Sequence, residues 1–191
     1  MVVKIINKLR LYQNLLYSFF IKSSLKKCGK KFHIEYPIRA HGAENIEIGD
    51  NFSSFGRLRI EAFTRHNNND YKPKIIIGDN VSMNFDCHIG AINSITIGNN
   101  VLLASRVFIT DHSHGEVNIN EFKIPPSQRK LFSKGEVIIK DNAWIGEGVT
   151  ILPNVIIGKN CIIGSNSVVT KSFPDNCIIG GAPARILKII E

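Results

Sequence analysis

The chain has 191 residues, of which 43% are hydrophobic, which is enough for one domain with a sizeable core and too little for two ordinary domains. Its formal net charge of +8 attracts polyanions such as nucleic acid, nucleotides, acidic sugars or anionic lipid head groups. The sequence has no helix-turn-helix, zinc-finger or aromatic RNA-binding signature, so we expect no nucleic-acid partner. The four cysteines form no CxxC pair and the chain is too large to need disulfides, which indicates a reducing, cytoplasmic compartment.

Residues 1–35 are expected to form a helical segment ahead of a main domain at 36–191. The apolar stretch from Leu9 to Ile21 is interrupted by Arg10, Gln13 and Asn14, so it is too short and too polar to span a bilayer. Its spacing predicts an amphipathic helix that packs on the body or on another subunit. A basic run follows it, either as a solvated face or as a peripheral contact with a membrane surface or an acidic partner. This run contains Lys22, Lys26, Lys27, Lys30 and Lys31.

A six-residue repeat runs through the second half of the chain. Six residues at steps of six from Ile139 are all β-branched aliphatics, and a small residue follows four positions after each of the first five. The aliphatic column is Ile139, Ile145, Ile151, Ile157, Ile163 and Val169, and the small column is Ala143, Val149, Val155, Cys161 and Ser167. Earlier copies begin at Ile48, Ile77 and Ile97, each followed by Gly. Such a fixed internal period is the signature of a repeat architecture.

The six-residue period decides the fold class. A strand alternates its faces every two residues and an α-helix repeats every 3.6 residues, so neither alone explains a period of six. A triangular coil does, because three hexapeptides make one turn and the aliphatic and small residues fill its interior. Stacked turns then pair as parallel strands and bury each other's apolar surface, and Gly or Asn at the corners accepts positive φ. The sequence therefore predicts an all-β solenoid from about residue 36.

Two segments break the period. The longer one, at about 110–135, contains His112, His114 and the pair Pro125 and Pro126. A long excursion from a regular solenoid is usually functional. The shorter one, residues 63–74, is polar and is expected to be a loop. The tail at 180–185 is expected to close the coil, and 186–191 is a short terminal segment.

His112 is the residue most suited to chemistry, since it stands where a repeat ends and the long excursion begins. Transfer of an acyl group from a thioester to a hydroxyl needs a base, and histidine suits this role near neutral pH. His114 is the alternative base or a neighbour that shapes the site. Zinc binding by His88, His112 and His114, as in γ-type carbonic anhydrases, would need three histidines to converge. Two of the three are only two positions apart on one segment, so we expect no metal.

Five motifs give the chain a resemblance to the hexapeptide-repeat acyltransferases, in particular to the galactoside and maltose acetyltransferases and to the O-antigen or capsule sugar O-acetyltransferases. The similarity covers residues 75–190. The motifs are Ile-Gly-Asn-Asn-Val-Leu-Leu-Ala (97–104), Thr-Asp-His-Ser-His-Gly (110–115), Asp-Asn-Ala-Trp-Ile-Gly (141–146), Ser-Val-Val-Thr-Lys (167–171) and Gly-Gly-Ala-Pro-Ala-Arg (180–185). The resemblance implies a left-handed parallel β-helix that forms a homotrimer and uses acetyl-CoA as acyl donor.

The resemblance also implies roles for single residues. His112 matches the catalytic base, and Asn84 matches an acceptor-contacting asparagine. An acidic residue that the galactoside and maltose enzymes place shortly afterwards has no match around 91–93, so we expect a different sugar. The positions that match the coenzyme A site are Trp144, Gly146, Ser165, Thr170, Lys171 and Arg185. Lysine and arginine at such positions can pair with the phosphates of coenzyme A.

The sequence thus predicts an acetyl-CoA-dependent sugar O-acetyltransferase of surface polysaccharide biosynthesis, with the acceptor bound between two subunits of a trimer. Three alternatives remain at this point. The chain could N-acetylate a nucleotide-linked amino sugar, serve as a non-catalytic scaffold, or act as a zinc-dependent hydratase.

Overall fold

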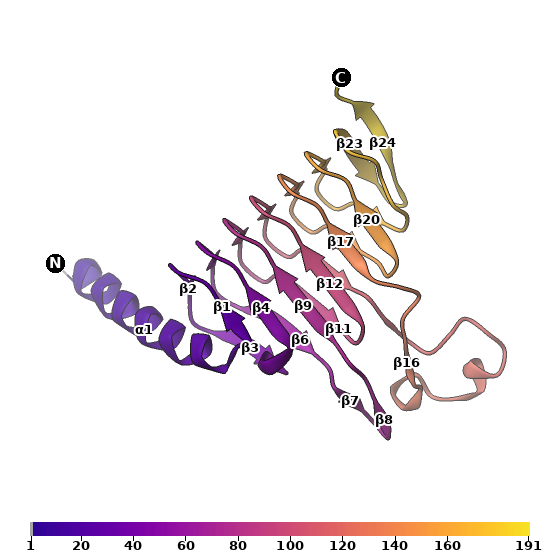
Figure 1. Ribbon diagram of the computed structural model, residues 1–191, viewed down its shortest axis with the longest axis horizontal. Helices are drawn as coiled ribbons and strands as arrows, with labels where there is room; N and C mark the ends of the chain where they lie inside the picture. Colours follow the sequence, from indigo (N-terminus) through magenta and orange to yellow (C-terminus); the bar gives the residue numbers. More distant parts are fainter. Residues whose placement is uncertain (1) are drawn as a thin grey trace.

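The computed structural model describes residues 2–191 and consists of one long helix followed by a three-sided coil (Figure 1). Six successive turns of the chain each place one strand in each of three sheets, and strands of neighbouring turns pair in parallel. The predicted coil of stacked parallel strands is therefore confirmed. The N-terminal helix and the C-terminal strands lie at opposite ends of the coil.

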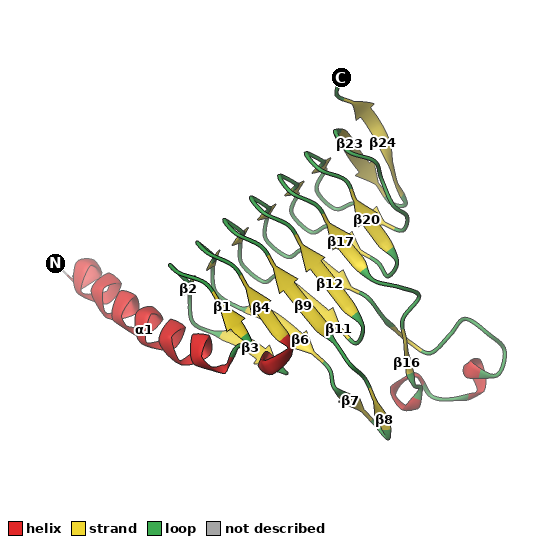
Figure 2. Ribbon diagram, viewed as in Figure 1, coloured by secondary structure: helices red, strands yellow, loops and turns green. Residues whose placement is uncertain are grey.

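Strands from non-consecutive positions in the sequence lie side by side in each sheet (Figure 2). The first sheet has the order β1 (Lys27–Cys28), β4 (Ile46–Ile48), β9 (Lys74–Ile77), β12 (Ser94–Ile97), β17 (Val137–Ile139) and β20 (Val155–Ile157). The second has the order β2 (His33–Ile34), β5 (Ser53–Ser54), β10 (Ser82–Met83), β13 (Leu102–Leu103), β18 (Trp144–Ile145), β21 (Ile162–Ile163), β23 (Cys177–Gly181) and β24 (Ala184–Ile189), the last antiparallel. The third has the order β3 (Ile38–His41), β6 (Leu58–Ala62), β11 (His88–Ala91), β14 (Phe108–Thr110), β19 (Thr150–Ile151) and β22 (Val168–Val169).

The core is the inside of the coil, and the six-residue repeat fills it. Both columns of the repeat are buried along their whole length, from Ile139 to Val169 and from Ala143 to Ser167. Gly146 shows why glycine follows an aliphatic residue at a corner, because a β-carbon there would lie 2.6 Å from the carbonyl oxygen of Ile163 on the next turn. The close stacking of turns thus requires the absence of a side chain at this point.

One corner of the coil carries a ladder of asparagines. All six have positive φ, and the side-chain amide of each of the first five donates a hydrogen bond of 2.8–3.0 Å to the side-chain oxygen of the asparagine on the following turn. The ladder comprises Asn51, Asn80, Asn100, Asn142, Asn160 and Asn176. Asparagine tolerates the left-handed conformation better than most residues. The same residue therefore permits the positive φ at the corner and links successive turns of the coil by its side chain.

Replacement of Asn100 by Ala is expected to lower the free energy of unfolding by about 2–3 kcal/mol, because it removes two ladder hydrogen bonds and places a β-carbon at positive φ. Asn100→Gly loses the same bonds but relieves the backbone, so its cost is expected to be smaller. Urea unfolding of the two variants measures the difference. An equal decrease in the free energy of unfolding of both variants would show that the positive φ adds nothing to the cost of Asn100→Ala.

Two excursions leave the coil on the same side (Figure 1). The shorter is a hairpin of β7 (Arg65–His66) and β8 (Asn69–Asp70), where the sequence predicted only a loop. The longer contains the antiparallel pair β15 (Ser113–His114) and β16 (Leu131–Phe132), with short 3-10 helices η2 (Glu121–Lys123) and η3 (Pro126–Gln128) between them. A further 3-10 helix, η1 (Ala43–Asn45), precedes β4.

The two excursions are bound to each other. The side-chain amide of Asn67 donates to the carbonyl oxygen of Ser127 over 3.2 Å. The hydroxyl of Tyr71 accepts from the backbone N–H of Leu131 over 2.9 Å and lies 3.2 Å from the carbonyl oxygen of that residue. The last part of the long excursion is therefore fixed to the shorter excursion.

Helix α1 (Val2–Ser24) lies at the N-terminal end of the coil and contacts β2. The amphipathic helix expected from Leu9 to Ile21 is thus present. The coil begins earlier than residue 36, because β1 and β2 already belong to its sheets. Within residues 2–191, no helix is long and apolar enough to cross a membrane.

Candidate active site

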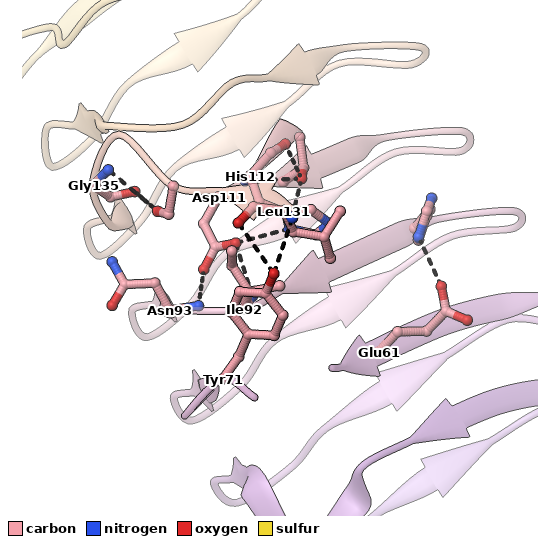
Figure 3. A network of polar contacts seen from close by, with 11 residues as sticks. Glu61, Tyr71, Ile92, Asn93, Asp111, His112, Leu131 and Gly135 are labelled. Atoms are coloured by element: carbon pink, nitrogen blue, oxygen red, sulfur yellow. Dashed lines mark hydrogen bonds and ion pairs between the residues drawn. The ribbon is translucent and has the colours of Figure 1, made fainter. Parts of the chain in front are cut away.

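His112 and Asp111 form a hydrogen-bonded pair directly after β14, at the point where the long excursion leaves the third sheet (Figure 3). Nδ1 of His112 lies 2.9 Å from Oδ1 of Asp111, whose side chain is fully buried. The backbone N–H groups of Ile92 and Asn93 donate to the two oxygens of the same carboxylate over 2.9 and 2.8 Å. Three donors therefore hold Asp111 in one orientation.

The hydrogen bond to Asp111 determines which ring nitrogen of His112 can act. Both oxygens of Asp111 already accept from backbone N–H groups, so the carboxylate is the acceptor and Nδ1 of His112 is the donor. In the neutral ring the other nitrogen, Nε2, is then the acceptor. Nε2 of His112 is thus free to accept a proton, and a buried carboxylate sets the orientation and the tautomer of the ring.

A pocket of about 420 Å³ opens beside His112. Its floor is the outer face of the third sheet, where Glu61, Gly90 and Thr110 lie in register on neighbouring strands. Both excursions contribute walls, with Phe63, His66, His114 and Leu131. The ring of Phe63 stands edge-on to His112 with centroids 5.9 Å apart. The pocket combines aromatic surface with a few convergent polar groups, as substrate sites do.

A second histidine and carboxylate lie in the same pocket. Glu61 is only 1% exposed and its Oε2 lies 3.1 Å from Nε2 of His88. The same carboxylate pairs with Arg39 over 2.9 Å and with Arg59 over 2.8 Å. Burial lowers the pKa of His88 and the positive charge of Arg59 lowers it further, which together outweigh the opposing effect of Glu61. His88 is therefore a neutral hydrogen-bonding group near neutral pH.

Gly90 keeps the space between the two histidines open. A β-carbon on Gly90 would lie 3.5 Å from Cε1 of His112 and 3.5 Å from Nε2 of His88, so these two ring atoms lie within twice that distance of each other. The gap has room for a small polar group in contact with both rings.

The remaining residues predicted for the site fall into two groups on one chain. Thr170 and Lys171 follow β22 in the third sheet, two strands from the β14 end that carries His112. The others belong to the second sheet or to the corner after it: Asn84, Trp144, Gly146, Ser165 and Arg185. Trp144 is 52% exposed on the outer face of β18. His114 lines the pocket, whereas Asn84 does not. One chain alone therefore does not bring the two groups together.

Sequence reasoning missed the roles of two buried acids. Asp111 was visible in the Thr-Asp-His motif but was given no function, and its contact with the backbone at Ile92 and Asn93 depends on pairing between turns 18 and 19 residues apart. Glu61 gave no signal, because it lies on β6 outside every motif. His88 was considered only as a zinc ligand, and among residues 2–191 no group of three His, Cys, Asp or Glu side chains is arranged to hold a metal ion.

The cysteines give no nucleophile at the pocket. Burial raises the pKa of the Cys87 thiol to about 11, and its sulfur points at the carbonyl oxygen of Ala104 inside the coil. Cys161 and Cys177 are also buried. Burial also raises the pKa of the Cys161 thiol, and thiols buried in this way are inert.

Comparison with known proteins identifies the family. Residues 136–171 match the family model described as "Bacterial transferase hexapeptide (six repeats)". The chain is 42% identical over 159 residues to the "Putative lipopolysaccharide biosynthesis O-acetyl transferase WbbJ" of Escherichia coli strain K12, which covers 81% of this chain and 77% of that protein. Its fold matches AntD, an N-acyltransferase from Bacillus cereus solved with coenzyme A and an amino-sugar nucleotide, with a TM-score of 0.72 at 22% identity over 89% and 87% of the two chains. It also matches a galactoside acetyltransferase solved with coenzyme A, with a TM-score of 0.59 at 30% identity over 90% and 68%. The chain belongs to the hexapeptide-repeat acyltransferases and is an enzyme of that family.

Proposed function

We propose that the protein transfers an acetyl group from acetyl-CoA to a hydroxyl of a sugar, with His112 as the general base. The observation that carries this proposal is the buried Asp111 held by two backbone N–H groups, which leaves Nε2 of His112 as a proton acceptor beside the pocket. The similarity to WbbJ supports O-acetylation and a place in surface polysaccharide biosynthesis. The coenzyme A complexes of the structural relatives support coenzyme A as the carrier of the acyl group.

The reaction proceeds by direct transfer. Nε2 of His112 takes the proton of the acceptor hydroxyl as its oxygen forms a bond to the thioester carbonyl carbon. A backbone N–H group at a nearby turn stabilises the negative charge on the former carbonyl oxygen. The carbon–sulfur bond then breaks, and His112 returns the proton to the departing thiolate. The protonated, inward-facing Cys87 supports a route without an acetyl-cysteine intermediate.

The acceptor lies on the N-terminal side of His112 along the third sheet. His88 is neutral and Glu61 orients it, so its ring can hydrogen-bond a sugar hydroxyl in the gap above Gly90. The aromatic rings of Phe63 and Phe108 line the same pocket and offer apolar faces for a sugar ring. His114 shapes the outer wall, and Asn84 contacts the acceptor only from a neighbouring chain.

The donor lies on the other side, across a contact between chains. We infer a homotrimer of left-handed coils, because the two groups of predicted site residues lie on different corners of one coil and a three-fold arrangement joins unlike corners of neighbours. In this assembly Trp144, Gly146 and Ser165 line the pantetheine arm. Thr170, Lys171 and Arg185 contact its polar and phosphate groups. The free cysteines fit a cytoplasmic location.

Calorimetric titration with acetyl-CoA tests the donor side, after the mass of the protein in solution has been measured. We expect one site per chain in a trimer. Lys171→Ala and Arg185→Ala should each raise the dissociation constant by about fivefold or more, since a charged hydrogen bond to phosphate is lost. Lys188→Ala on exposed β24 is the matched control and should bind as the wild type does. No heat of binding at millimolar acetyl-CoA would contradict the proposal and favour the scaffold alternative.

A further inference from the structure

Helix α1 attaches to the coil through one narrow strip. The hydroxyl of buried Ser18 accepts from the backbone N–H of Ile34 over 3.0 Å, and the hydroxyl of Tyr17 donates to the carbonyl oxygen of Ile38 over 2.9 Å. Asn14 accepts from the backbone N–H of Tyr36 over 3.0 Å. Tyr17 and Ile21 also pack against the core. These contacts fix which side of the helix faces the coil.

The opposite side of α1 is apolar and uncovered. A helix advances by about 100° per residue, so residues at spacings of 4, 3, 4 and 3 from position 5 share one face. This face consists of Ile5, Leu9, Tyr12, Leu16 and Phe19, which are between 53% and 68% exposed. Leu15 and Phe20 widen it on either side, and both are more than half exposed. Within residues 2–191 no other segment covers this face, which is far more apolar than a solvated helix requires.

Several polar residues of α1 face the coil, where a helix that only covers the end of the coil would place apolar residues. Asn7, Arg10 and Gln13 line a pocket of about 650 Å³ between α1 and the first turns of the coil. The usual arrangement, with apolar residues toward the body and polar residues toward water, is therefore inverted over the first half of α1. An amphipathic helix with this orientation presents its apolar face to something outside the chain.

The charge of the whole chain is concentrated at this end. Residues 1–34 contain eight Lys or Arg and no Asp or Glu, which equals the net charge of +8, while residues 35–191 contain 16 of each sign. Lys4 and Lys8 lie on the flank of the apolar face, and Lys27, Lys30 and Lys31 are exposed on the first turn of the coil. An apolar helical face beside unbalanced lysines has the chemistry of a helix that lies in the interface of an anionic membrane.

The pocket at His112 extends toward the same end. Arg59 and Arg39 line both that pocket and a neighbouring groove of about 440 Å³. Arg57 lines both this groove and the pocket beneath α1, which also contains Arg10. In the third sheet β3, which carries Arg39, is the strand nearest the N-terminal end. A row of arginines therefore leads from the catalytic histidine to the helix.

We propose that α1 seats the protein on an anionic membrane surface, with the apolar face in the lipid interface and the lysines at the head groups. A second copy of the chain is a poorer occupant, because two such ends would bring eight uncompensated positive charges from each chain together. Where the proposed acetyl transfer holds, this docking turns the acceptor side of the pocket toward sugars carried by lipid.

Sedimentation with vesicles tests the docking on the full chain. We expect the wild type to bind vesicles of phosphatidylglycerol and phosphatidylcholine, to bind pure phosphatidylcholine at least about tenfold more weakly, and to be released in part by 0.5 M salt. The variant Leu9→Glu/Leu16→Glu/Phe19→Glu should lose at least about tenfold in vesicle affinity. The matched control Val117→Glu/Ile119→Glu/Phe122→Glu places the same charges on exposed apolar residues of the long excursion and should bind as the wild type does.

Lys4→Glu/Lys8→Glu supplies a second variant that leaves the apolar face intact, and it should weaken binding to the anionic vesicles alone. Docking is overturned if the wild type stays in the supernatant with anionic vesicles, or if the helix variant sediments as the wild type does. It is also overturned if the helix variant lowers the mass of the assembly in solution while the wild type binds no vesicles, since the face then joins copies of the chain. Acetyl-CoA titration of the same variants reports on the proposed reaction separately, because vesicle binding requires no donor.

Discussion

Replacement of His112 by Ala is expected to lower kcat by about two orders of magnitude or more, because the reaction loses its proposed general base. The dissociation constant of acetyl-CoA should stay close to that of the wild type, since the imidazole acts on the acceptor hydroxyl and not on the phosphates. The measurement is a steady-state assay of thiol release from acetyl-CoA with a saccharide acceptor, together with calorimetry of donor binding.

His114→Ala is the control for His112→Ala, because His114 on β15 lines the same pocket. Among residues 2–191 no carboxylate pairs with His114 as Asp111 pairs with His112. We expect a change of less than about tenfold in kcat, as for a residue that shapes the site. Near-wild-type turnover of His112→Ala would remove His112 from the mechanism. If His112→Ala lowers kcat only mildly with an amino-sugar acceptor, that result would favour N-acylation, since an amine needs less help from a base than a hydroxyl does.

Asp111→Asn is expected to lower kcat by about two orders of magnitude with little change in the KM for acetyl-CoA. If the amide oxygen faces His112, the amide nitrogen must face a backbone N–H group that it cannot bind, and the reverse orientation places a donor against Nδ1 of His112. In either orientation the tautomer and position of the imidazole are no longer fixed. The split between kcat and KM distinguishes this positioning role from a purely structural one.

Asp79→Asn is the matched control for Asp111→Asn. Asp79 also accepts a backbone N–H, that of Asp50, over 2.7 Å, and Asn99 already fills the equivalent position on the next turn. The control should leave kcat unchanged within about twofold. Thermal unfolding of both variants shows whether a loss of activity is a loss of fold. Unchanged kcat in Asp111→Asn would mean that the buried carboxylate only holds the loop at Ile92 and Asn93.

The fold could be predicted from the sequence because the repeat is a local pattern. Each six-residue copy places one aliphatic and one small residue inside the coil. The columns that begin at Ile139 and Ala143 therefore repeat the same buried pattern in every copy, and each copy supports the same fold. The start of the coil was predicted too late because β1 and β2 are two residues long and carry no hexapeptide signal. The sequence predicted a loop where β7 and β8 form a hairpin, because residues 65–70 are all polar and show no alternation of apolar and polar positions.

The site could be predicted only in part, since contacts between turns are not visible in sequence. His112 stood out by its place at the end of a repeat. Asp111 gains its role only when Ile92 and Asn93 of the preceding turn lie beside it. Glu61 is 27 residues from His88 in sequence and next to it in space. The inverted face of α1 appears only once Ser18 and Tyr17 show which side meets the coil.

The most direct test of the account is the chemical stability of the acetyl group that the protein transfers. Radiolabelled acetyl-CoA is incubated with the wild type and two acceptor sets, saccharides with free hydroxyls and nucleotide-linked amino sugars, and each product is treated with mild alkali. Transfer to a sugar hydroxyl forms an ester, so we predict label in the saccharide set that alkali releases as acetate. Label that appears in the amino-sugar set and withstands alkali is an amide, and that result would contradict O-acetylation as the function of this protein.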